Sequence, residues 1–589
     1  MERSKIDNKY KWKLEDLYKS IDEYNEDIIK VDSLVTDLLN YKGKLLKDDK
    51  TLLNALLIQE QIDMITSKLY VFINMRLHED TRVSKFQELS GNLDIILNHL
   101  NEKTSFFVPE LLEKDFDFVK KLISKNNELK RFEFLLETIY NEKDHILNKD
   151  IEEVLSRTGT IMSSPDNIYS TLNDADLIFN KIKDENAKLV ELTKGNYYKY
   201  SISNNRNVRK NAFNTFYKKY KELNNTFASI MNSNLQVSCF LTKTRKYKNP
   251  INLYLDSNKI DENIYYDLIK EVNNNLDKMY KYIDLRKERL NLNNIHMYDM
   301  SVKLSDDNSK EYTFDEAKEL VTKALSVLGD KYVTDLNNGF ENGWIDVFEN
   351  NGKRSGAYSW GCYNAHPYVL LNYQSKYNDV STLAHEMGHA MHRYYSNLKQ
   401  DYFYSDNQIF VAEIASTVNE LLLNFYMLKN CKDNAEKKKI INELLDDIKN
   451  TIYRQTMFAE FELDIHNRAF NGETLSSDKL NEIYFELVKK YHKGVIVDDN
   501  IKYEWSRIPH FYTPFYVYQY ATGLSIALTI ASKIFDNDKE MLNKYLLFLE
   551  SGSNDYPTNL VEKMGINIRD AVCCALGKFN ELIEEYKTL

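Results

Sequence analysis

The chain has 589 residues, a formal net charge of −11 and a pI of about 5.7. A chain of this length can bury a large core without disulfides and is expected to form more than one module. The acidic balance gives no reason to expect a nucleic-acid partner. The five cysteines form no C-x-x-C pair, which argues against a disulfide framework or a thiolate metal site and suits a reducing compartment.

The segment from Met1 to Asp7 is charged and leads into no apolar run of the kind found in signal peptides. No uncharged run of about 18 apolar residues occurs in the sequence, so we expect no membrane span. These features predict a cytoplasmic protein. They do not define its oligomeric state.

Helical periodicity dominates the N-terminal third of the chain. Apolar residues recur at helical spacing, for example over residues 52–57 and 93–100. Only 17 glycines and 7 prolines interrupt the 589 residues, which favours long helices with few tight turns. The sequence therefore predicts a mainly helical fold.

Residues 339–373 are the most strand-like part of the sequence, because glycines and aromatic side chains cluster there. Residues 357–360 and 368–373 are predicted to be strands. A new helix is expected to follow, with Asp379 or Ser381 as its cap. We thus expect a small β-sheet directly before this helix.

The helix contains His385-Glu386-Met387-Gly388-His389, which matches the pattern H-E-x-x-H. Residues four apart on a helix differ by about 40° around its axis, so both imidazoles can share one metal ion. Two imidazoles and a carboxylate suit Zn²⁺ and leave one position for water. Glu386 is then predicted to be the general base that acts on a water activated by the metal. A chance match is the weaker interpretation in a chain with only 11 histidines.

A carboxylate is expected to be the third metal ligand. The metzincin pattern is excluded, because His392 and Tyr395 stand where it requires Gly and His. Glu413 and Glu420 interrupt an apolar helical run over residues 409–428, and a buried carboxylate needs a cation or hydrogen bonds. We expect Glu413 to be the ligand and Glu420 to orient an imidazole, although a place at the polar edge of the helix also explains Glu420.

Three further residues are considered as ligands and set aside. His366 follows a predicted strand, and His392 lies one turn beyond the motif, so both are expected to be surface or packing histidines. Cys362 has no second cysteine near it in sequence with which to hold zinc.

An aromatic segment over residues 509–523 is the second candidate for catalytic chemistry. Peptide hydrolysis needs donors for the oxyanion that forms when water attacks a carbonyl, and a phenol or an imidazolium can supply them. Tyr516 and Tyr520 point the same way if the segment is helical. Packing explains so dense a run of tyrosines about equally well.

Four segments together resemble the thimet oligopeptidase and oligoendopeptidase F family of zinc metallopeptidases: residues 353–359, 379–392, 412–417 and 510–523. Their order and spacing match too, with Glu413 falling 24 residues after His389. Weaker similarities occur at residues 12–18, 175–176 and 209–213, and residues 551–557 are similar to the oligoendopeptidase F branch in particular. The resemblance thus covers essentially the whole chain.

The resemblance implies a two-lobed, mainly helical metallopeptidase with a small β-sheet next to the H-E-x-x-H helix and a deep channel for short peptides. It implies one Zn²⁺ per chain, held by His385, His389 and Glu413, with Glu386 as general base. The chain is then a zinc-dependent endopeptidase that cleaves internal bonds of oligopeptides, with neither nucleic acid nor membrane as partner. We expect an N-terminal helical domain over residues 1–195 and a catalytic domain over residues 196–589.

The resemblance also assigns residues that act on the substrate. His510, Tyr516 and Tyr520 correspond to groups that stabilise the tetrahedral intermediate. This alignment needs a one-residue insertion after His510 relative to the thimet branch. Without it, Phe515 and Gln519 would take the tyrosine positions.

A predicted strand provides the substrate-binding residues Gly356, Ala357 and Tyr358. By the resemblance, this segment pairs with the substrate backbone as an added β-strand. Other zinc peptidases with two histidines and a glutamate stay open as alternatives, but no Gly-x-Met-Glu-Asn segment is present to bind the α-amine as in an aminopeptidase. A helical protein that only binds peptides is less consistent with the sequence, since it has no need of Glu386 as a base.

Overall fold

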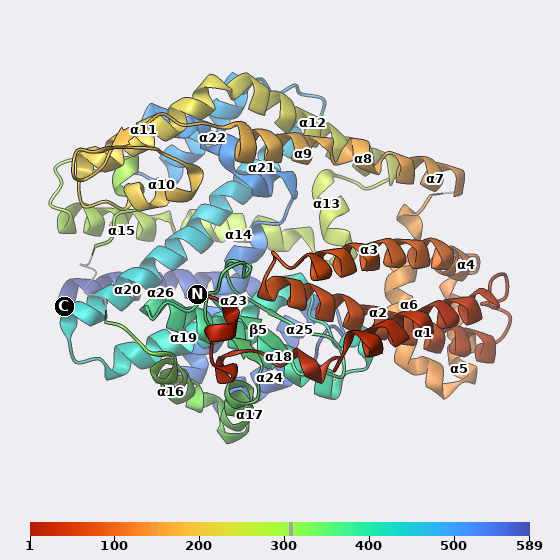
Figure 1. Cartoon of the computed structure of the whole chain (residues 1–589). Helices are drawn as coiled ribbons and strands as arrows, with labels where there is room; N and C mark the ends of the chain where they lie inside the picture. Colours follow the sequence, from red (N-terminus) through yellow and green to blue (C-terminus); the bar gives the residue numbers. More distant parts are fainter. Residues whose placement is uncertain (148, 305–309) are drawn as a thin grey trace. The chain divides into compact units, whose positions relative to one another are not determined.

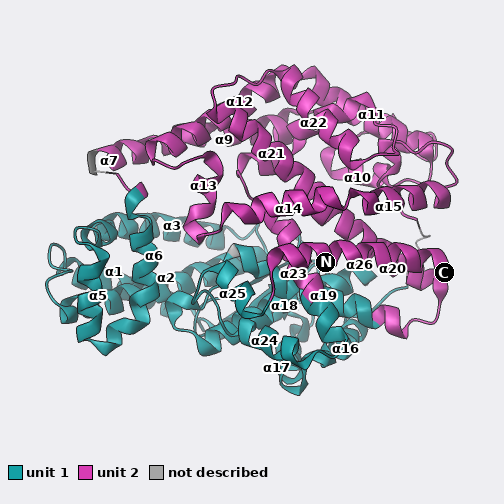
Figure 2. Ribbon diagram, turned by 180° about the vertical axis from the view of Figure 1, so that it is seen from behind, with its two compact units in different colours: residues 1–144, 309–426, 530–565 teal, residues 145–308, 427–529, 566–589 magenta. Residues whose placement is uncertain are grey.

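The computed structural model describes residues 1–147, 149–304 and 310–589, and it is mainly helical (Figure 1). The chain forms two compact units, each assembled from three separate stretches of sequence (Figure 2). Unit 1 comprises residues 1–144, 309–426 and 530–565, and unit 2 comprises residues 145–308, 427–529 and 566–589. The predicted helical, two-part fold is confirmed, whereas the division at residues 195 and 196 stays a prediction.

Unit 1 contains the N-terminal helices, a three-stranded sheet and the helices around it. Its elements are α1 (Ile21–Leu39), α2 (Asp49–Glu79), α3 (Ser84–Thr104), α4 (Phe107–Leu111), α5 (Phe116–Lys125), α6 (Glu133–Asn141), α16 (Phe314–Leu325), α17 (Asp330–Glu341), β3 (Ile345–Asp346), β4 (Tyr358–Trp360), β5 (Tyr368–Leu370), α18 (Tyr377–Lys399), α24 (Lys539–Leu549) and α25 (Pro557–Lys563). Two helices continue from one unit into the other: α19 (Ile409–Asn430) and α23 (Tyr518–Phe535).

Unit 2 is helical apart from a two-stranded ribbon. Its elements are α7 (Lys149–Arg157), α8 (Gly159–Met162), α9 (Ser164–Ser170), β1 (Ile182–Lys183), β2 (Leu189–Val190), α10 (Lys194–Ser201), α11 (Arg206–Glu222), α12 (Asn224–Thr244), α13 (Pro250–Leu255), α14 (Glu262–Asn274), α15 (Leu276–Arg289), α20 (Asn434–Ile448), the π-helical turn η11 (Lys449–Tyr453), α21 (Arg454–Phe470), α22 (Ser477–Tyr491), the 3₁₀ segments η12 (Asp499–Arg507) and η13 (Pro509–Tyr512), and α26 (Ile568–Thr588).

Many helix starts follow from local hydrogen bonding. Ser20 precedes α1, and its side chain accepts a hydrogen bond from the backbone N–H of Glu23. Thr313 and Glu316 form a reciprocal capping box at the start of α16. These side chains satisfy backbone donors that the first helical turn leaves without a partner, which typically stabilises a helix by about 1 kcal/mol.

The sheet of unit 1 has the strand order β3-β5-β4. Strand β5 pairs in parallel with β3, placing Val369 opposite Ile345, and antiparallel with β4, placing Leu370 opposite Tyr358. Tyr368 and Leu370 belong to the hydrophobic core that α1, α2 and α3 also build. The predicted strands are thus present, and β4 is an edge strand with a pairing partner on one side only, within the described residues.

Helix α18 packs against both β4 and β5, so the predicted sheet does lie beside the H-E-x-x-H helix. The helix begins at Tyr377, earlier than either predicted cap allows. Asp379 lies in the first turn and accepts hydrogen bonds from the backbone N–H groups of Gln374 and Lys376. The cap prediction was therefore wrong in position, although Asp379 does help to start the helix.

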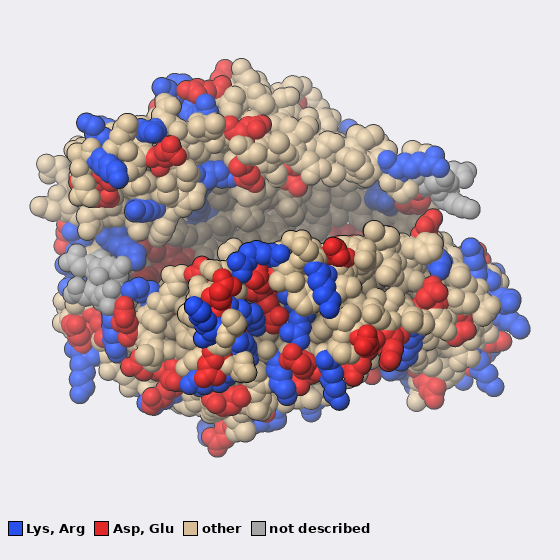
Figure 3. Space-filling model, in the orientation of Figure 1, with Lys and Arg blue, Asp and Glu red and all other residues tan. Residues whose placement is uncertain are grey.

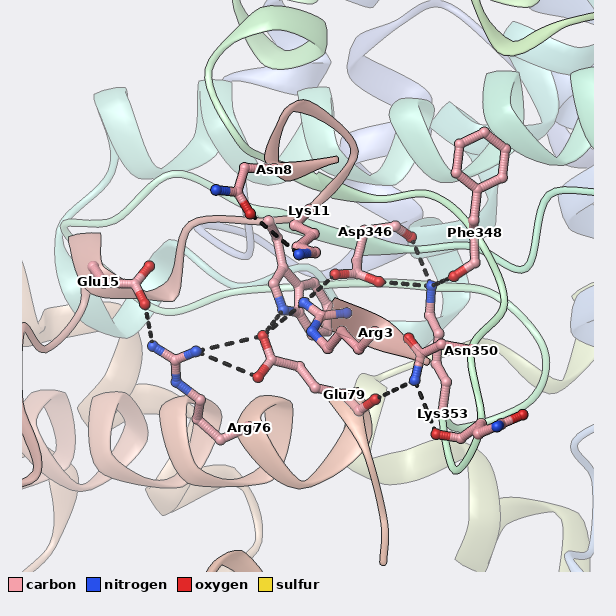
Figure 4. Close-up of polar contacts among 12 residues, drawn as sticks. Arg3, Asn8, Lys11, Glu15, Arg76, Glu79, Asp346, Phe348, Asn350 and Lys353 are labelled. Atoms are coloured by element: carbon pink, nitrogen blue, oxygen red, sulfur yellow. Dashed lines mark hydrogen bonds and ion pairs between the residues drawn. The ribbon is translucent and has the colours of Figure 1, made fainter. Parts of the chain in front are cut away.

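A network of ion pairs joins the N-terminal segment to the sheet (Figure 4). Asp346 on β3 pairs with Arg3 and, at 2.7 Å, with the Nζ atom of Lys353. Arg3 also reaches Glu79 at the end of α2, and Glu79 in turn pairs with Arg76. The network holds the segment that leads into β4 against both β3 and α2.

The visible surface carries charges of both signs. Lys and Arg residues are interspersed with Asp and Glu residues on the face shown in Figure 3. Exposed ion pairs, such as Lys318 with Glu341, contribute about 0–1 kcal/mol each, so burial of apolar side chains provides most of the stability. Within residues 1–147, 149–304 and 310–589, no helix combines the length and the apolar character that a membrane span requires.

Candidate metal centre

Helix α18 presents His385 and His389 on one face, as predicted from their spacing. Their ring centroids lie 4.9 Å apart, and the rings are nearly perpendicular. Both side chains are partly exposed, at 26% for His385 and 22% for His389, so their nitrogens can be reached from a cavity. One face of a single helix thus offers two metal-ligating nitrogens.

Glu413 on α19 completes a three-residue cluster with these histidines. Its Oε2 atom lies 3.4 Å from Nε2 of His385 and 3.5 Å from Nε2 of His389. One ligand atom from each of the three residues lies within 4.8 Å of the other two. Two imidazoles and one carboxylate form the donor set typical of a catalytic zinc site with one position left open.

Gly388 allows α18 and α19 to approach closely enough for this cluster to form. A Cβ atom at this position would lie 2.5 Å from Cα of Ser416 and 2.8 Å from the carbonyl oxygen of Ala415. Both are backbone atoms of α19, so they cannot rotate away. The absence of a side chain at Gly388 therefore allows the short distance between the two helices that carry the ligands.

Glu420 lies about two helical turns beyond Glu413 and contacts the Nδ1 side of the His385 ring. Its Oε2 atom is 3.0 Å from Nδ1 of His385, and its Oε1 atom accepts a hydrogen bond of 2.9 Å from the hydroxyl of Ser381. A hydrogen bond at Nδ1 directs Nε2 toward a metal and makes the imidazole a better ligand. The structure thus places Glu420 where the sequence predicts it.

The side chains of the cluster shift one another's pKa values. Burial opposes protonation of His385, but the hydrogen bond and charge of Glu420 outweigh it and raise the pKa of His385 to about 9. Burial also acts on Glu413, yet its two histidine neighbours lower the pKa of its carboxyl to about 2. The Glu413 carboxylate is therefore ionised beside the two imidazoles.

Glu386 lies on the same helix, and its side chain is almost fully buried, with 6% of the residue exposed. Its Oε2 atom has no hydrogen-bond partner among the described residues. Burial raises the pKa of this carboxyl above its usual value. A buried carboxylate oxygen without a partner is costly unless it has another group to bind. The oxygen thus fits a position beside a metal and a water, and the residues present match a zinc site.

A cavity of about 470 Å³ opens onto the cluster. Its lining includes Ala357, Tyr358 and Ser359, together with Arg393 and Asn407. Gly356, the first residue of the predicted substrate-binding segment, directly precedes Ala357. Its φ of +84° is a conformation that favours glycine. The strand predicted to bind substrate is therefore next to the predicted metal ligands.

A hydrogen-bonded chain of side chains fixes the start of β4. His78 on α2 lies between two residues of the loop and strand: its Nδ1 is 2.7 Å from the hydroxyl of Tyr358, and its Nε2 is 2.7 Å from Nη1 of Arg354. Burial, together with the charge of Arg354, lowers the pKa of His78 to about 4, so the ring is neutral. The sequence alone did not identify His78, because nothing local links it to residues 276 and 280 positions away.

The predicted transition-state residues form a cluster of their own in unit 2. The hydroxyl of Tyr520 is 3.3 Å from Nε2 of His510. The ring centroid of Tyr516 lies 5.4 Å from that of Tyr520 and 6.4 Å from that of His510. Tyr516 precedes α23, so the contact arises from the turn before the helix and not from helical spacing.

Phe515 has a different environment, which bears on the alignment of this segment. It is buried, with φ of +57°, and its ring contacts Tyr254, Tyr265 and His466. Tyr516 and Tyr520 are thus the residues that meet His510, while Phe515 belongs to the core. This arrangement agrees with the alignment that contains the insertion.

The residues that were set aside as ligands have other contacts. His392 is buried, and its ring lies 5.0 Å from that of Phe548. His366 stacks on Trp344 with 5.5 Å between centroids. Cys362 is part of the hydrophobic core of unit 1, where burial raises the pKa of its thiol to about 11.

Two helices that carry a histidine pair, a carboxylate as third ligand and a buried glutamate, beside an edge strand, are the arrangement of a metallopeptidase. The chain belongs to peptidase family M3: the model of that family matches residues 199–572, and a second model, oligopeptidase F, matches residues 110–179. The resemblance drawn from the sequence is thereby confirmed, and the protein is a metalloendopeptidase that hydrolyses peptides.

Several characterised proteins are similar over the full length of the chain. Oligopeptidase PepF of Bacillus subtilis is 38% identical, with 100% of this chain and 88% of the relative covered. Group B oligopeptidase PepB of Streptococcus agalactiae is 34% identical, with 100% and 98% covered. The crystal structure of oligoendopeptidase-F from Enterococcus faecium matches with a TM-score of 0.74 at 30% identity, covering 96% of this chain and 98% of that one.

Proposed function

We propose that the protein is a zinc-dependent oligoendopeptidase in which His385, His389 and Glu413 bind the metal and Glu386 is the general base. The observation that carries the proposal is the buried Oε2 atom of Glu386, which lacks a partner among the described residues. Glu386 lines the same cavity as three residues whose ligand atoms lie within 4.8 Å of one another. When bound, Zn²⁺ acts as a Lewis acid on the substrate carbonyl and lowers the pKa of water.

The side chains of the chain itself carry out the remaining steps. Glu386 takes a proton from the attacking water and passes it to the leaving amine, for which its raised pKa is suited. Glu420 keeps the proton of His385 on Nδ1, so that Nε2 is free to bind the metal. His510, Tyr516 and Tyr520 are assigned to stabilising the oxyanion by the family resemblance, with Tyr520 and His510 already hydrogen-bonded to each other.

Peptide substrates are proposed to bind as an extra strand along β4. The free edge of β4 offers backbone donors and acceptors to an extended peptide, and Ala357 and Tyr358 line the same cavity as the metal cluster. Main-chain pairing of this kind requires an extended segment, which short peptides adopt readily and folded proteins do not. We therefore propose oligopeptides with internal scissile bonds as the substrate class, and the deep channel stays a prediction.

The test uses an internally quenched peptide with both ends blocked. Cleavage is expected to stop when a chelator removes the metal and to return when Zn²⁺ is added. Glu386→Gln is expected to bind zinc, as measured by metal analysis after dialysis, but to lose most turnover. Glu341→Gln, the same change at an exposed position on α17, provides the matched control.

Three results would contradict the proposal. Cleavage that survives complete metal removal would exclude the metal mechanism, and substantial activity of Glu386→Gln would remove this residue as the base. Binding of varied peptides without cleavage by the zinc-loaded protein would favour a peptide-binding role.

A further inference from the structure

Unit 2 contains a cavity of about 240 Å³ that shares no lining residue with the cavity at the metal cluster. Its wall includes four cationic side chains, Arg209, Lys449, Arg454 and Arg507, but only one carboxylate, Glu504. The histidine in the wall, His492, is neutral, because burial lowers its pKa to about 4. The cavity wall therefore carries an excess of three positive charges.

The carboxylate of Glu504 already has two hydroxyl donors and two arginines as partners. It accepts hydrogen bonds from the hydroxyls of Tyr217 at 3.0 Å and Tyr484 at 2.6 Å. It also pairs with Arg454 at 2.7 Å and Arg507 at 3.1 Å. One carboxylate thus neutralises only one of two guanidinium groups.

The same two-to-one pattern occurs at the two carboxylates behind the wall. Each of them pairs with two cations, one of which lines the cavity: Asp299 with Arg206 and Arg209, and Asp446 with Arg286 and Lys449. Counted over these ion pairs alone, three carboxylates meet six cations.

The ion network of unit 1 differs, because its charges are balanced. There, three cations (Arg3, Arg76 and Lys353) meet three carboxylates (Glu15, Glu79 and Asp346). Unpaired charge away from water is costly, so an uncompensated group of cations around a cavity calls for an anionic partner.

Two of the arginines that line the cavity have an unused donor. The Nε atoms of Arg209 and Arg507 are buried and have no hydrogen-bond partner among the described residues. Burial lowers the pKa of Lys449, in line with the energetic cost of holding this ammonium group among other cations. A guanidinium offers a planar set of N–H donors that fits carboxylate and phosphate oxygens.

We propose that the cavity is a binding site for a small polyanion that carries phosphate or carboxylate groups. The excess charge calls for more than one anionic group, and the cationic side chains lie on separate elements, namely α11, η11, α21 and η12. The volume is that of about eight water molecules, larger than one monatomic ion needs. Tyr453 and Met279 in the wall can pack against an apolar part of the ligand.

Isothermal titration calorimetry of the zinc-loaded protein tests the site with three probes: pyrophosphate, citrate and chloride, at constant ionic strength. Saturable binding of pyrophosphate or citrate is expected. Tighter binding of pyrophosphate would identify phosphate groups as the preferred ligand chemistry, and tighter binding of citrate would identify carboxylate groups. Arg507→Gln should weaken this binding at least about tenfold, since a charged hydrogen bond contributes about 1.5–3 kcal/mol.

Two further variants show whether the probe binds in the cavity. Lys449→Met removes a different positive charge from the cavity lining. Asp446 keeps Arg286 as its partner in this variant, so Lys449→Met tests the site even if Arg507→Gln misfolds. Arg468→Gln is the control, because Arg468 is an exposed arginine on α21 that also pairs with carboxylates.

The proposal is overturned if neither polyanion binds, or if chloride alone binds. It is also overturned if binding stays unchanged in folded Arg507→Gln and Lys449→Met proteins, because the probe would then be bound at the zinc ion or elsewhere.

Discussion

The Nδ1 atom of His385 lies 3.0 Å from the Oε2 atom of Glu420, about two helical turns beyond the proposed ligand Glu413. Since this contact orients the imidazole and makes it a better ligand, Glu420→Gln is expected to lower zinc affinity about 10- to 100-fold. Competition with a chelator of known affinity measures the change. Ser381→Ala, which removes only the other hydrogen bond of Glu420, should have a smaller effect, and equal affinities in all three proteins would contradict this role.

Gly388→Ala is expected to reduce both stability and metal affinity. The added methyl group meets backbone atoms of α19 at Ser416, so the two helices must separate, at a cost of about 1–3 kcal/mol. Gly577→Ala in α26 is the control, because nothing lies within 4 Å of its Cβ and the helix should become slightly more stable. Chemical unfolding and zinc titration report the two effects. A Gly388→Ala protein with unaltered zinc affinity would show that the ligands do not depend on this close approach.

Tyr520→Phe tests the proposed role of the tyrosine cluster. Removal of one oxyanion donor typically lowers kcat about 100-fold, whereas KM should change little because the donor acts mainly in the transition state. Tyr512→Phe provides the comparison, since the Tyr512 ring stacks on Tyr169 with 4.2 Å between centroids and serves in packing. Equal kcat values for the two variants and the wild type would return Tyr520 to a packing role.

His78→Ala is expected to raise KM by about 2- to 10-fold and to change kcat less. The imidazole joins Tyr358 of the edge strand to Arg354, and the loss of one or two such hydrogen bonds loosens the surface on which the substrate is proposed to pair. His99→Ala, at an exposed position on α3, is the matched control. Steady-state kinetics with the quenched peptide separates the two parameters, and an unchanged KM would argue against this positioning role.

Glu462 is expected to make stability depend on pH. It is fully buried, its Oε2 atom accepts a hydrogen bond from Tyr265, and burial raises the pKa of its carboxyl to about 8. His466, one turn on, is also buried, which lowers its pKa to about 4. Below pH 6.5 the two groups act in opposite directions, since the folded state retains the proton of Glu462 but rejects that of His466.

Between about pH 6.5 and pH 8, only Glu462 of this pair differs in protonation between the folded and unfolded states. The unfolded chain has released this proton and the folded protein keeps it, so stability falls as pH rises, by about 2 kcal/mol over the window. Glu462→Gln should remove this part of the slope. Urea unfolding at the two pH values measures it, and identical slopes in both proteins would contradict the assignment.

The metal cluster was largely predictable because its information is local. His385, Glu386 and His389 share one helix, so their spacing alone places them on one side of it, and Glu413 stood out as a carboxylate within an apolar run. Phe515 shows the limit of such reasoning: spacing left its register open, and a turn with positive φ directs it into the core.

Contacts between distant segments could not be predicted in this way. His78 and Tyr358 meet across 280 positions of sequence, and the approach of Gly388 to Ser416 depends on how two helices pack. The charge excess around the cavity of unit 2 likewise comes from cations on four separate elements, each of which is ordinary in its own sequence context.

The chain contributes to unit 1 three times, and its last contribution, residues 530–565, includes the helix whose Phe548 covers His392. During translation, His385, His389 and Glu413 leave the ribosome before that helix has been made. At a synthesis rate of about 5–20 residues per second, the interval is on the order of ten seconds. A nascent chain therefore exposes the back of its metal-ligating helix, and its ligands can meet cellular metal ions, before unit 1 is complete.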